Sequence, residues 1–157
     1  ALGRAHEFAR PHSEESRPEH SESHLQGLLS EVLAPYPALD EGRITIRGDD
    51  VPIDDRGATP IALVVHELAT NAAKYGALST PEGSIDIEVV EEGDLVEIIW
   101  VERNGPTIVG APDRVGFGTR LAEMSIVQQL GGRLNRTWDP RGLEVRIEVL
   151  AKHLRRD

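Results

Sequence analysis

The segment HELATNAAKYG, residues 66–76, determines the helix around which the rest of this chain is organised. At about 100° per residue, Glu67, Asn71 and Lys74 fall on one stripe of a helix. The pattern predicts a long helix over residues 59–75. Its opposite side carries small and apolar residues that suit packing under a sheet, namely Ile61, Leu68, Ala69 and Ala72.

Helical and strand patterns alternate on both sides of this segment. Pro60 near the first turn and Gly76 after the last are expected to bound the long helix. A helix with Ser21 as N-cap is expected to end at Pro35 and Pro37. Another helix is expected over residues 119–130, stopped by Gly131-Gly132. Alternating or short apolar runs predict strands over residues 43–48, 85–89, 96–102, 134–137 and 143–149.

The predicted strands are apolar on one face and charged on the other. Ile85 and Ile87 alternate with Asp86 and Glu88, for example. Such strands form a sheet with helices on one side and water on the other. The fold class is therefore an α/β (α+β) two-layer sandwich. A doubly wound fold is not expected, because its buried parallel strands have continuous apolar runs.

Composition limits the kind of protein. The chain has 157 residues, a net charge of −10 and no Cys. The negative charge argues against a nucleic-acid binder, and the lack of Cys excludes disulfides and thiol catalysis. No run of about 18 apolar residues spans a membrane, and no signal peptide is visible. Because the chain starts at Ala1 and its only Met is Met124, we expect a fragment of a longer protein. The lack of Cys fits a reducing compartment, so a cytoplasmic location is expected.

The polar stripe of the long helix can carry chemistry. The Asn71 amide and the Glu67 carboxylate can complete an octahedral Mg²⁺ site together with water and phosphate oxygens. Lys74 can neutralise phosphate, and Glu67 can act as a general base. The alternative is a solvated helix face with a Glu-to-Lys pair.

Two further segments can hold an anion or a base. Gly116-Phe117-Gly118-Thr119 leads into a helix, whose N-terminal N–H groups can bind phosphate, although a plain helix-start turn has the same pattern. Trp100-Val101-Glu102 ends a strand, where Glu102 can accept a hydrogen bond from an exocyclic amine such as that of adenine. The alternatives are a core Trp and a surface Glu.

Together, these segments resemble the GHKL ATPase and histidine kinase superfamily, and within it the HWE subgroup of sensor histidine kinases. That subgroup is named for a His in the N box and a Trp-x-Glu in the G1 box, which here are His66 and Trp100 with Glu102. The likeness extends over residues 25–149. It implies a Bergerat-type ATP-binding fold with a mixed, mainly antiparallel sheet.

The resemblance also implies roles for the site residues. Asn71 and Glu67 would be the metal ligands of a Mg-ATP site. Glu67, Lys74 and the subgroup marker His66 would form its catalytic set. The nucleotide-binding set would comprise Asn71, Glu102, Gly105, Gly116, Phe117, Gly118 and Thr119, with residues 103–115 as the ATP lid.

One departure from the subgroup lies in the lid, where Asn104 replaces the first glycine of Trp-x-Glu-x-Gly-Gly-Pro. Asn tolerates left-handed backbone better than most residues, so the turn is expected to survive. At the other end of the chain, residues 1–21 resemble the end of a dimerisation helix plus a linker, which leaves residues 22–157 as the catalytic domain. His6 is not expected to be the phosphoacceptor. His20 and His24 suit a polar linker better than a metal site.

The implied function is transfer of the ATP γ-phosphate to a histidine on the dimerisation domain of the same protein, and from there to a response regulator receiver domain. The chain by itself is expected to bind ATP and Mg²⁺ but to lack autokinase activity. Two alternatives stay open. One is a GHKL ATPase in which Glu67 activates water, and the other is a non-catalytic nucleotide-binding docking module.

Overall fold

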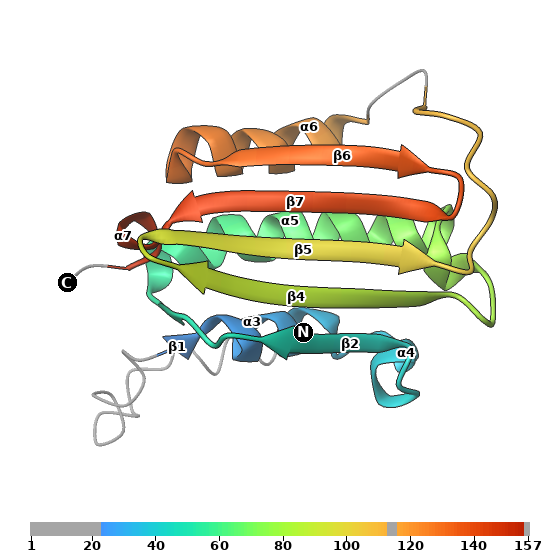
Figure 1. Cartoon of the computed structure of the whole chain (residues 1–157), viewed down its shortest axis with the longest axis horizontal. Coiled ribbons are helices and arrows are strands. Elements are labelled where there is room, and N and C mark those ends of the chain that lie inside the picture. The colour runs from blue at the N-terminus through green and yellow to red at the C-terminus, as the bar shows by residue number, and fades with distance from the viewer. Residues whose placement is uncertain (1–22, 113–115, 156–157) are drawn as a thin grey trace.

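A five-stranded sheet forms one layer of the computed structural model, which describes residues 23–112 and 116–155. The strand order is β2-β4-β5-β7-β6 (Figure 1). β2 runs parallel to β4, and every other neighbouring pair is antiparallel, so the prediction of a mixed, mainly antiparallel sheet is confirmed. The strands are β2 (Ile44–Gly48), β4 (Ser84–Glu92), β5 (Leu95–Arg103), β6 (Arg133–Asp139) and β7 (Gly142–Leu150).

Helices form the second layer on one face of this sheet (Figure 1). The longest helix, α5, lies behind the central strands, between α3 and α6. Short elements complete the fold, among them a two-stranded ladder of β1 and β3. The helices are α3 (Leu25–Leu33), α4 (Pro37–Asp40), α5 (Asp55–Lys74), η1 (Ala77–Ser79), α6 (Phe117–Met124), its π-helical continuation η2 (Ser125–Gln129) and α7 (Ala151–Leu154), and the short strands are β1 (Ser23–His24) and β3 (Pro52–Ile53).

The hydrophobic core fills the space between the two layers. Alternate residues of β4, β5 and β7 are buried there, and the predicted apolar side of α5 faces them. Burial of this much apolar surface is the main force that holds a helix layer on a sheet. The predicted apolar side of α5 is buried, namely Ile61, Leu68, Ala69 and Ala72. On β5 the buried residues that share one face are Val96, Ile98, Trp100 and Glu102.

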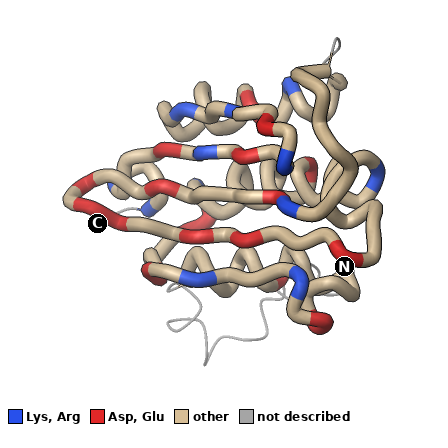
Figure 2. Tube along the Cα trace, turned by 45° about the vertical axis from the view of Figure 1, so that its right-hand side comes forward, with Lys and Arg blue, Asp and Glu red and all other residues tan. Residues whose placement is uncertain are grey.

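The other face of the sheet carries charges. Acidic and basic residues recur along its strands (Figure 2), and they pair across them. Arg47 on β2 binds Asp86 on β4 at 2.9 Å, and Arg146 on β7 binds Glu97 on β5 at 3.0 Å. A face of this kind is solvated, so the predicted two-layer sandwich is confirmed.

The structure corrects the start of the long helix. α5 begins at Asp55, four residues before the predicted start, because the Asp54 side chain caps it by accepting a hydrogen bond from the Arg56 N–H at 2.9 Å. Pro60 therefore lies inside the helix and is buried. The prediction took this proline for a first-turn residue, which is the commonest position for proline in a helix.

The other helix boundaries differ by a few residues. α3 begins at Leu25, after His24, whose backbone belongs to β1. The expected N-cap Ser21 and the predicted linker of residues 1–21 lie outside the described residues. α6 begins at Phe117, two residues before the predicted start.

Later segments follow the prediction more closely. Gly131 has a left-handed φ of 61°, as a helix-ending glycine should. β6 is longer than expected because it pairs with β7 as far as Asp139, and α7 was not expected. Within the described ranges, no helix is long and apolar enough to cross a membrane.

Candidate functional site

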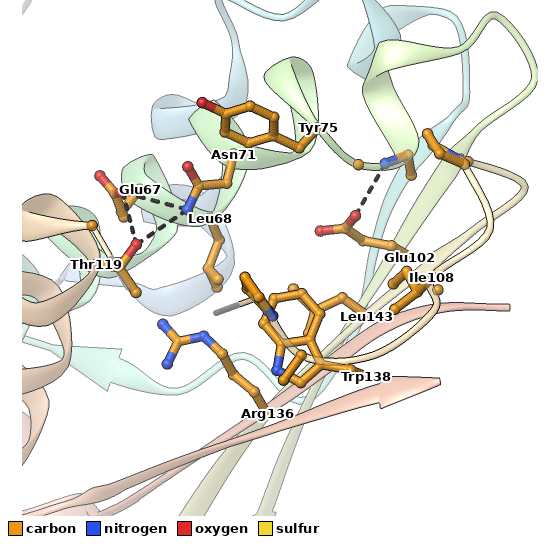
Figure 3. Close-up of a pocket in the computed structure, with 18 residues that line it drawn as sticks. Glu67, Leu68, Asn71, Tyr75, Glu102, Ile108, Thr119, Arg136, Trp138 and Leu143 are labelled. Carbon is orange, nitrogen blue, oxygen red and sulfur yellow. Dashed lines mark hydrogen bonds between the residues drawn. The ribbon is translucent and has the colours of Figure 1, made fainter. Parts of the chain in front are cut away.

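A cavity of about 710 Å³ opens between α5, the segment after β5, the start of α6 and the β6–β7 hairpin (Figure 3). Volumes in this range are typical of small-molecule sites. Its walls combine a few polar side chains with many apolar ones. The lining residues are Glu67, Leu68, Asn71, Tyr75, Gly76, Ala77, Glu102, Gly105, Pro106, Ile108, Ala111, Pro112, Gly116, Thr119, Arg136, Trp138, Gly142 and Leu143.

One end of the cavity holds a cluster of three polar side chains. Glu67 and Asn71 come from one stripe of α5, and Thr119 comes from the first turn of α6. The Thr119 hydroxyl donates to Glu67 Oε2 at 3.1 Å, and Asn71 Nδ2 lies 3.4 Å from the same oxygen and 3.3 Å from Thr119 Oγ1. The cluster therefore ties α6 to α5, and Glu67 Oε1 and the Asn71 amide oxygen take no part in these hydrogen bonds (Figure 3).

Glu102 occupies the other end of the cavity (Figure 3). It is only 4% exposed, although it carries a carboxylate. Its Oε2 accepts a hydrogen bond from Trp100 Nε1 at 2.9 Å, and its Oε1 accepts one from the Ala77 N–H at 3.0 Å. Burial raises the pKa of Glu102 above its ordinary value, while these two donors act in the opposite direction. Trp100 is thus a core residue, as the simpler interpretation held, but it also fixes the carboxylate.

The turn after α5 brings this carboxylate close to the helix end. A Cβ on Gly76 would collide with Glu102 Oε1, so the glycine is needed here for close approach. Its φ of −112° shows that it does not end the helix by a left-handed conformation, contrary to the usual reason for a glycine there. Since Glu67 lies seven residues before Lys74, the last residue of α5, about 10 Å of helix separates the two ends of the cavity.

Apolar side chains line the space between the two ends. Ile108 comes from the segment after β5, Trp138 from β6 and Leu143 from β7 (Figure 3). Trp138 and Ile108 are half-buried, so they retain surface that a ligand could cover. This arrangement suits a flat, mostly apolar group held between a carboxylate and a wall of side chains.

The segment after β5 forms a turn at Asn104, the residue that replaces the first glycine of the subgroup's lid motif. Asn104 has a φ of 63°, the one left-handed residue other than glycine in the described part of the chain. The expectation that Asn sustains this turn is confirmed. Gly105 lines the cavity, and a Cβ on it would come within 2.7 Å of the Ala77 Cα. Its close approach is therefore to the protein's own backbone.

Four of the expected site residues lie outside the cavity wall. Lys74 and His66 are exposed on α5. Phe117 is 81% exposed at the start of α6. Gly118 packs against the Glu67 carboxylate, since a Cβ there would lie 2.7 Å from Oε1. The helical stripe was thus correctly placed, but only its first two polar members face the cavity.

The structure adds cavity residues that no motif in the sequence had indicated. Arg136 and Trp138 lie on the inward side of β6, and Tyr75 follows α5. Two features of the sequence could have indicated them. Residues 139–142 form a tight turn, so the strand before it pairs with the strand after it. Alternation along β6 then puts Leu134, Arg136 and Trp138 on the same face.

The polar cluster provides ligands of the kind that Mg²⁺ prefers. Glu67 offers a carboxylate oxygen, Asn71 an amide oxygen and Thr119 a hydroxyl. No group of three or more His, Cys, Asp or Glu side chains that could hold a metal occurs among the described residues. Since Mg²⁺ usually keeps waters and substrate phosphates and takes only one or two protein carboxylates, this cluster fits that ion in a shared site.

The curated proteins that are similar to this chain in sequence are blue-light-activated histidine kinases. No family model matches the chain. A blue-light-activated histidine kinase of Erythrobacter litoralis is 33% identical over 127 residues, which cover 80% of this chain and 35% of that protein. One of Rhizobium johnstonii is 35% identical over 127 residues, covering 80% of this chain and 36% of that protein. The chain thus spans about a third of the length of these curated relatives.

Solved structures share the fold. The Erythrobacter litoralis blue-light-activated histidine kinase matches with a TM-score of 0.68 and 24% identity, covering 82% of this chain and 42% of that one. The catalytic domain of histidine kinase ThkA matches with a TM-score of 0.64 and 20% identity, covering 83% and 95%. ThkA in complex with response regulator protein TrrA matches with a TM-score of 0.60 and 17% identity, covering 97% and 48%. This chain therefore has the fold of histidine kinase catalytic domains, and about four fifths of it is similar in sequence to blue-light-activated histidine kinases.

Proposed function

We propose that this chain is the ATP-binding catalytic domain of a two-component sensor histidine kinase of the HWE subgroup. It transfers the γ-phosphate of ATP to a histidine on the dimerisation domain of the same protein, and the phosphate then passes to an aspartate of a response regulator receiver domain. The observation that carries the proposal is the cavity itself. Along one helix it joins an oxygen-ligand cluster of Glu67, Asn71 and Thr119 to the buried acceptor Glu102.

The adenine binds at the Glu102 end. Each carboxylate oxygen there already accepts one hydrogen bond, and each has capacity for a second. Glu102 can therefore accept a hydrogen bond from the exocyclic amine of adenine, in an orientation set by Trp100 and Ala77. The apolar side chains of Ile108, Trp138 and Leu143 flank the position of the base.

The phosphates lie at the other end. There Asn71, with Glu67 beside it, would hold Mg²⁺, and the ion would supply charge neutralisation for the transfer. Glu67 either helps to hold the ion or orients the acceptor histidine and accepts its proton. A bond forms between the imidazole nitrogen and the γ-phosphorus while the bond to ADP breaks. Catalysis then rests on positioning and charge neutralisation, as in phosphoryl transfer generally.

Partners follow from the same proposal. The structure of ThkA with response regulator protein TrrA supports a receiver domain as the downstream partner. The acceptor histidine belongs to a dimerisation domain, so the chain by itself binds nucleotide without autokinase activity. Because the reaction uses cellular ATP, the proposal places the domain in the cytoplasm. Lys74 and His66 are exposed outside the cavity. Their catalytic roles stay predictions from the sequence.

Calorimetry with ATP, with and without Mg²⁺, tests the site. The 157-residue chain should bind ATP in a Mg²⁺-dependent manner. Asn71→Ala should weaken that binding roughly ten-fold or more, as loss of a metal-site group usually does. Asn135→Ala is the matched control, since Asn135 is exposed on the outward side of β6. Equal Mg²⁺-dependent affinity in wild type and Asn71→Ala contradicts the assignment of the metal end.

Phosphotransfer separates the proposal from its two rivals. The full-length protein with γ-labelled ATP should acquire acid-labile, base-stable phosphate, which is characteristic of phosphohistidine. Sustained ATP hydrolysis by the isolated chain, lost in Glu67→Ala, would instead favour a GHKL ATPase that activates water. Binding without any labelled protein from the full-length chain would favour a docking module.

A further inference from the structure

Arg136 is a charged residue in the cavity wall to which neither the sequence nor the proposed function assigns a role. It lies on the inward side of β6, and its side chain is 16% exposed. Its Nη1 donates to Glu123 Oε1 at 3.0 Å. Figure 3 draws the guanidinium on the same side of the cavity as Thr119 and away from Glu102.

The ion pair confirms that placement independently. Glu123 and Thr119 are four residues apart on α6, so their side chains are neighbours on one helix face, with Cβ atoms about 6 Å apart. A guanidinium that reaches Glu123 therefore lies toward the Thr119 end of the cavity, whose wall both Arg136 and Thr119 line. That is the end where Glu67 and Asn71 also lie.

The charges of the cavity make this placement significant. Among the described residues that line it, the acidic side chains are Glu67 and Glu102, and Arg136 is the one Lys or Arg. Lys74, the cation expected to contact phosphate, is exposed outside the wall. A polyanion bound between these carboxylates requires a nearby positive charge, and a guanidinium provides paired N–H donors that match phosphate oxygens.

We propose that Arg136 is a phosphate-binding residue, which exchanges its ion pair with Glu123 for the phosphate groups of the bound nucleotide. This inference rests on the proposed function, in that the ligand is a nucleoside triphosphate. The exchange costs little on the carboxylate side, because the Glu123 side chain is 41% exposed and is solvated when the pair opens. Arg136 lies on a paired strand, so its backbone is held at the cavity wall and only the side chain has to turn from Glu123 to the phosphates.

Binding of ATP and of adenosine to the 157-residue chain, both measured by calorimetry, tests the inference. Wild type should bind ATP with Mg²⁺ more tightly than adenosine. Arg136→Met should weaken ATP binding roughly ten- to one-hundred-fold, the range expected for hydrogen bonds to a charged group, and should leave adenosine binding unchanged. Arg136→Lys should fall between the two, because it retains the charge without the paired donors.

Two controls isolate the phosphate contact. Arg133→Met makes the same change on the outward side of the same strand, at an arginine whose side chain is 79% exposed and pairs with Glu148, and it should leave both affinities unchanged. Glu123→Gln removes the competing carboxylate, so ATP should bind up to about five-fold more tightly. Thermal unfolding of each variant shows whether it is folded.

The outcomes separate this inference from the proposed function. Wild-type affinity for ATP in a folded Arg136→Met overturns the phosphate contact alone. Equal loss of ATP and adenosine binding in Arg136→Met also overturns it, since the residue would then support the cavity and not the phosphates. A wild-type chain that binds neither ligand overturns the proposed function together with this inference.

Discussion

Replacing Trp100 by Phe removes one hydrogen bond from the most deeply buried charge of the site. Trp100 is 1% exposed and Glu102 is 4% exposed. The indole N–H donates to Glu102 Oε2 at 2.9 Å, and the Ala77 N–H is the other donor to this carboxylate. Phe keeps an aromatic ring at the position but has no donor. The variant therefore leaves a buried carboxylate with one of its two protein hydrogen bonds.

Two contributions set the size of the effect. A hydrogen bond to a charged group contributes about 1.5–3 kcal/mol to stability. The smaller ring leaves a partial cavity in the core, which adds about 1–2 kcal/mol. The free energy of unfolding at pH 7 should therefore fall by about 2.5–5 kcal/mol, a large share of the about 5–15 kcal/mol that holds a typical domain folded.

The loss should depend on pH in a defined direction. Burial raises the pKa of Glu102 above its ordinary value of 4.5, and the Trp100 donor opposes that rise. Trp100→Phe therefore raises the pKa further. A carboxyl whose pKa is higher in the folded state destabilises the protein when ionised, and this penalty disappears as the pH falls through the folded pKa. The loss of unfolding free energy relative to wild type should be largest at pH 7 and should become smaller toward pH 4.5.

Urea unfolding in two backgrounds measures this hydrogen bond. Trp100→Phe is compared with wild type, and Trp100→Phe/Glu102→Gln is compared with Glu102→Gln, both at pH 7 and near pH 5. In the Gln background the effect of the Trp change should be smaller by about 1–2 kcal/mol and independent of pH, because no charge is present. An equal loss of stability in both backgrounds, unchanged by pH, would refute the assigned hydrogen bond and the pKa argument together.

Two further predictions concern backbone positions at the cavity. Gly118→Ala places a methyl group 2.7 Å from Glu67 Oε1, so it should displace this carboxylate and weaken Mg²⁺-dependent ATP binding in calorimetry; unchanged affinity with an unchanged melting temperature would contradict the packing of Gly118 on Glu67. Asn104 has a φ of 63°, so Asn104→Ala should lower the free energy of unfolding by about 1 kcal/mol while Asn104→Gly lowers it little or not at all. Equal effects of Ala and Gly at this position, measured by urea unfolding, would show that the turn is not left-handed.

Periodicity in the sequence was enough to predict the layers of the fold. Alternation along β4, β5 and β7 specified which residues point inward, because neighbouring side chains on a strand project to opposite faces. The boundaries were less well predicted. α5 starts at Asp55 because Asp54 caps it and because a buried Pro60 is tolerated inside the helix, and local propensity argues against such a proline.

For the site, the sequence by itself determined that Glu67 and Asn71 share one helix face. It also determined that Glu102 lies near the end of a strand, on the same face as Trp100. Only the tertiary structure decided what lies opposite them. It left Lys74 exposed and brought Arg136 into the cavity wall. The physical reason is that periodicity fixes the face of an element on which a side chain lies, whereas the element opposite that face is set by long-range strand pairing and helix packing. Here β6 is placed beside β7 at the edge of the sheet, where its inward face meets α6 and the cavity.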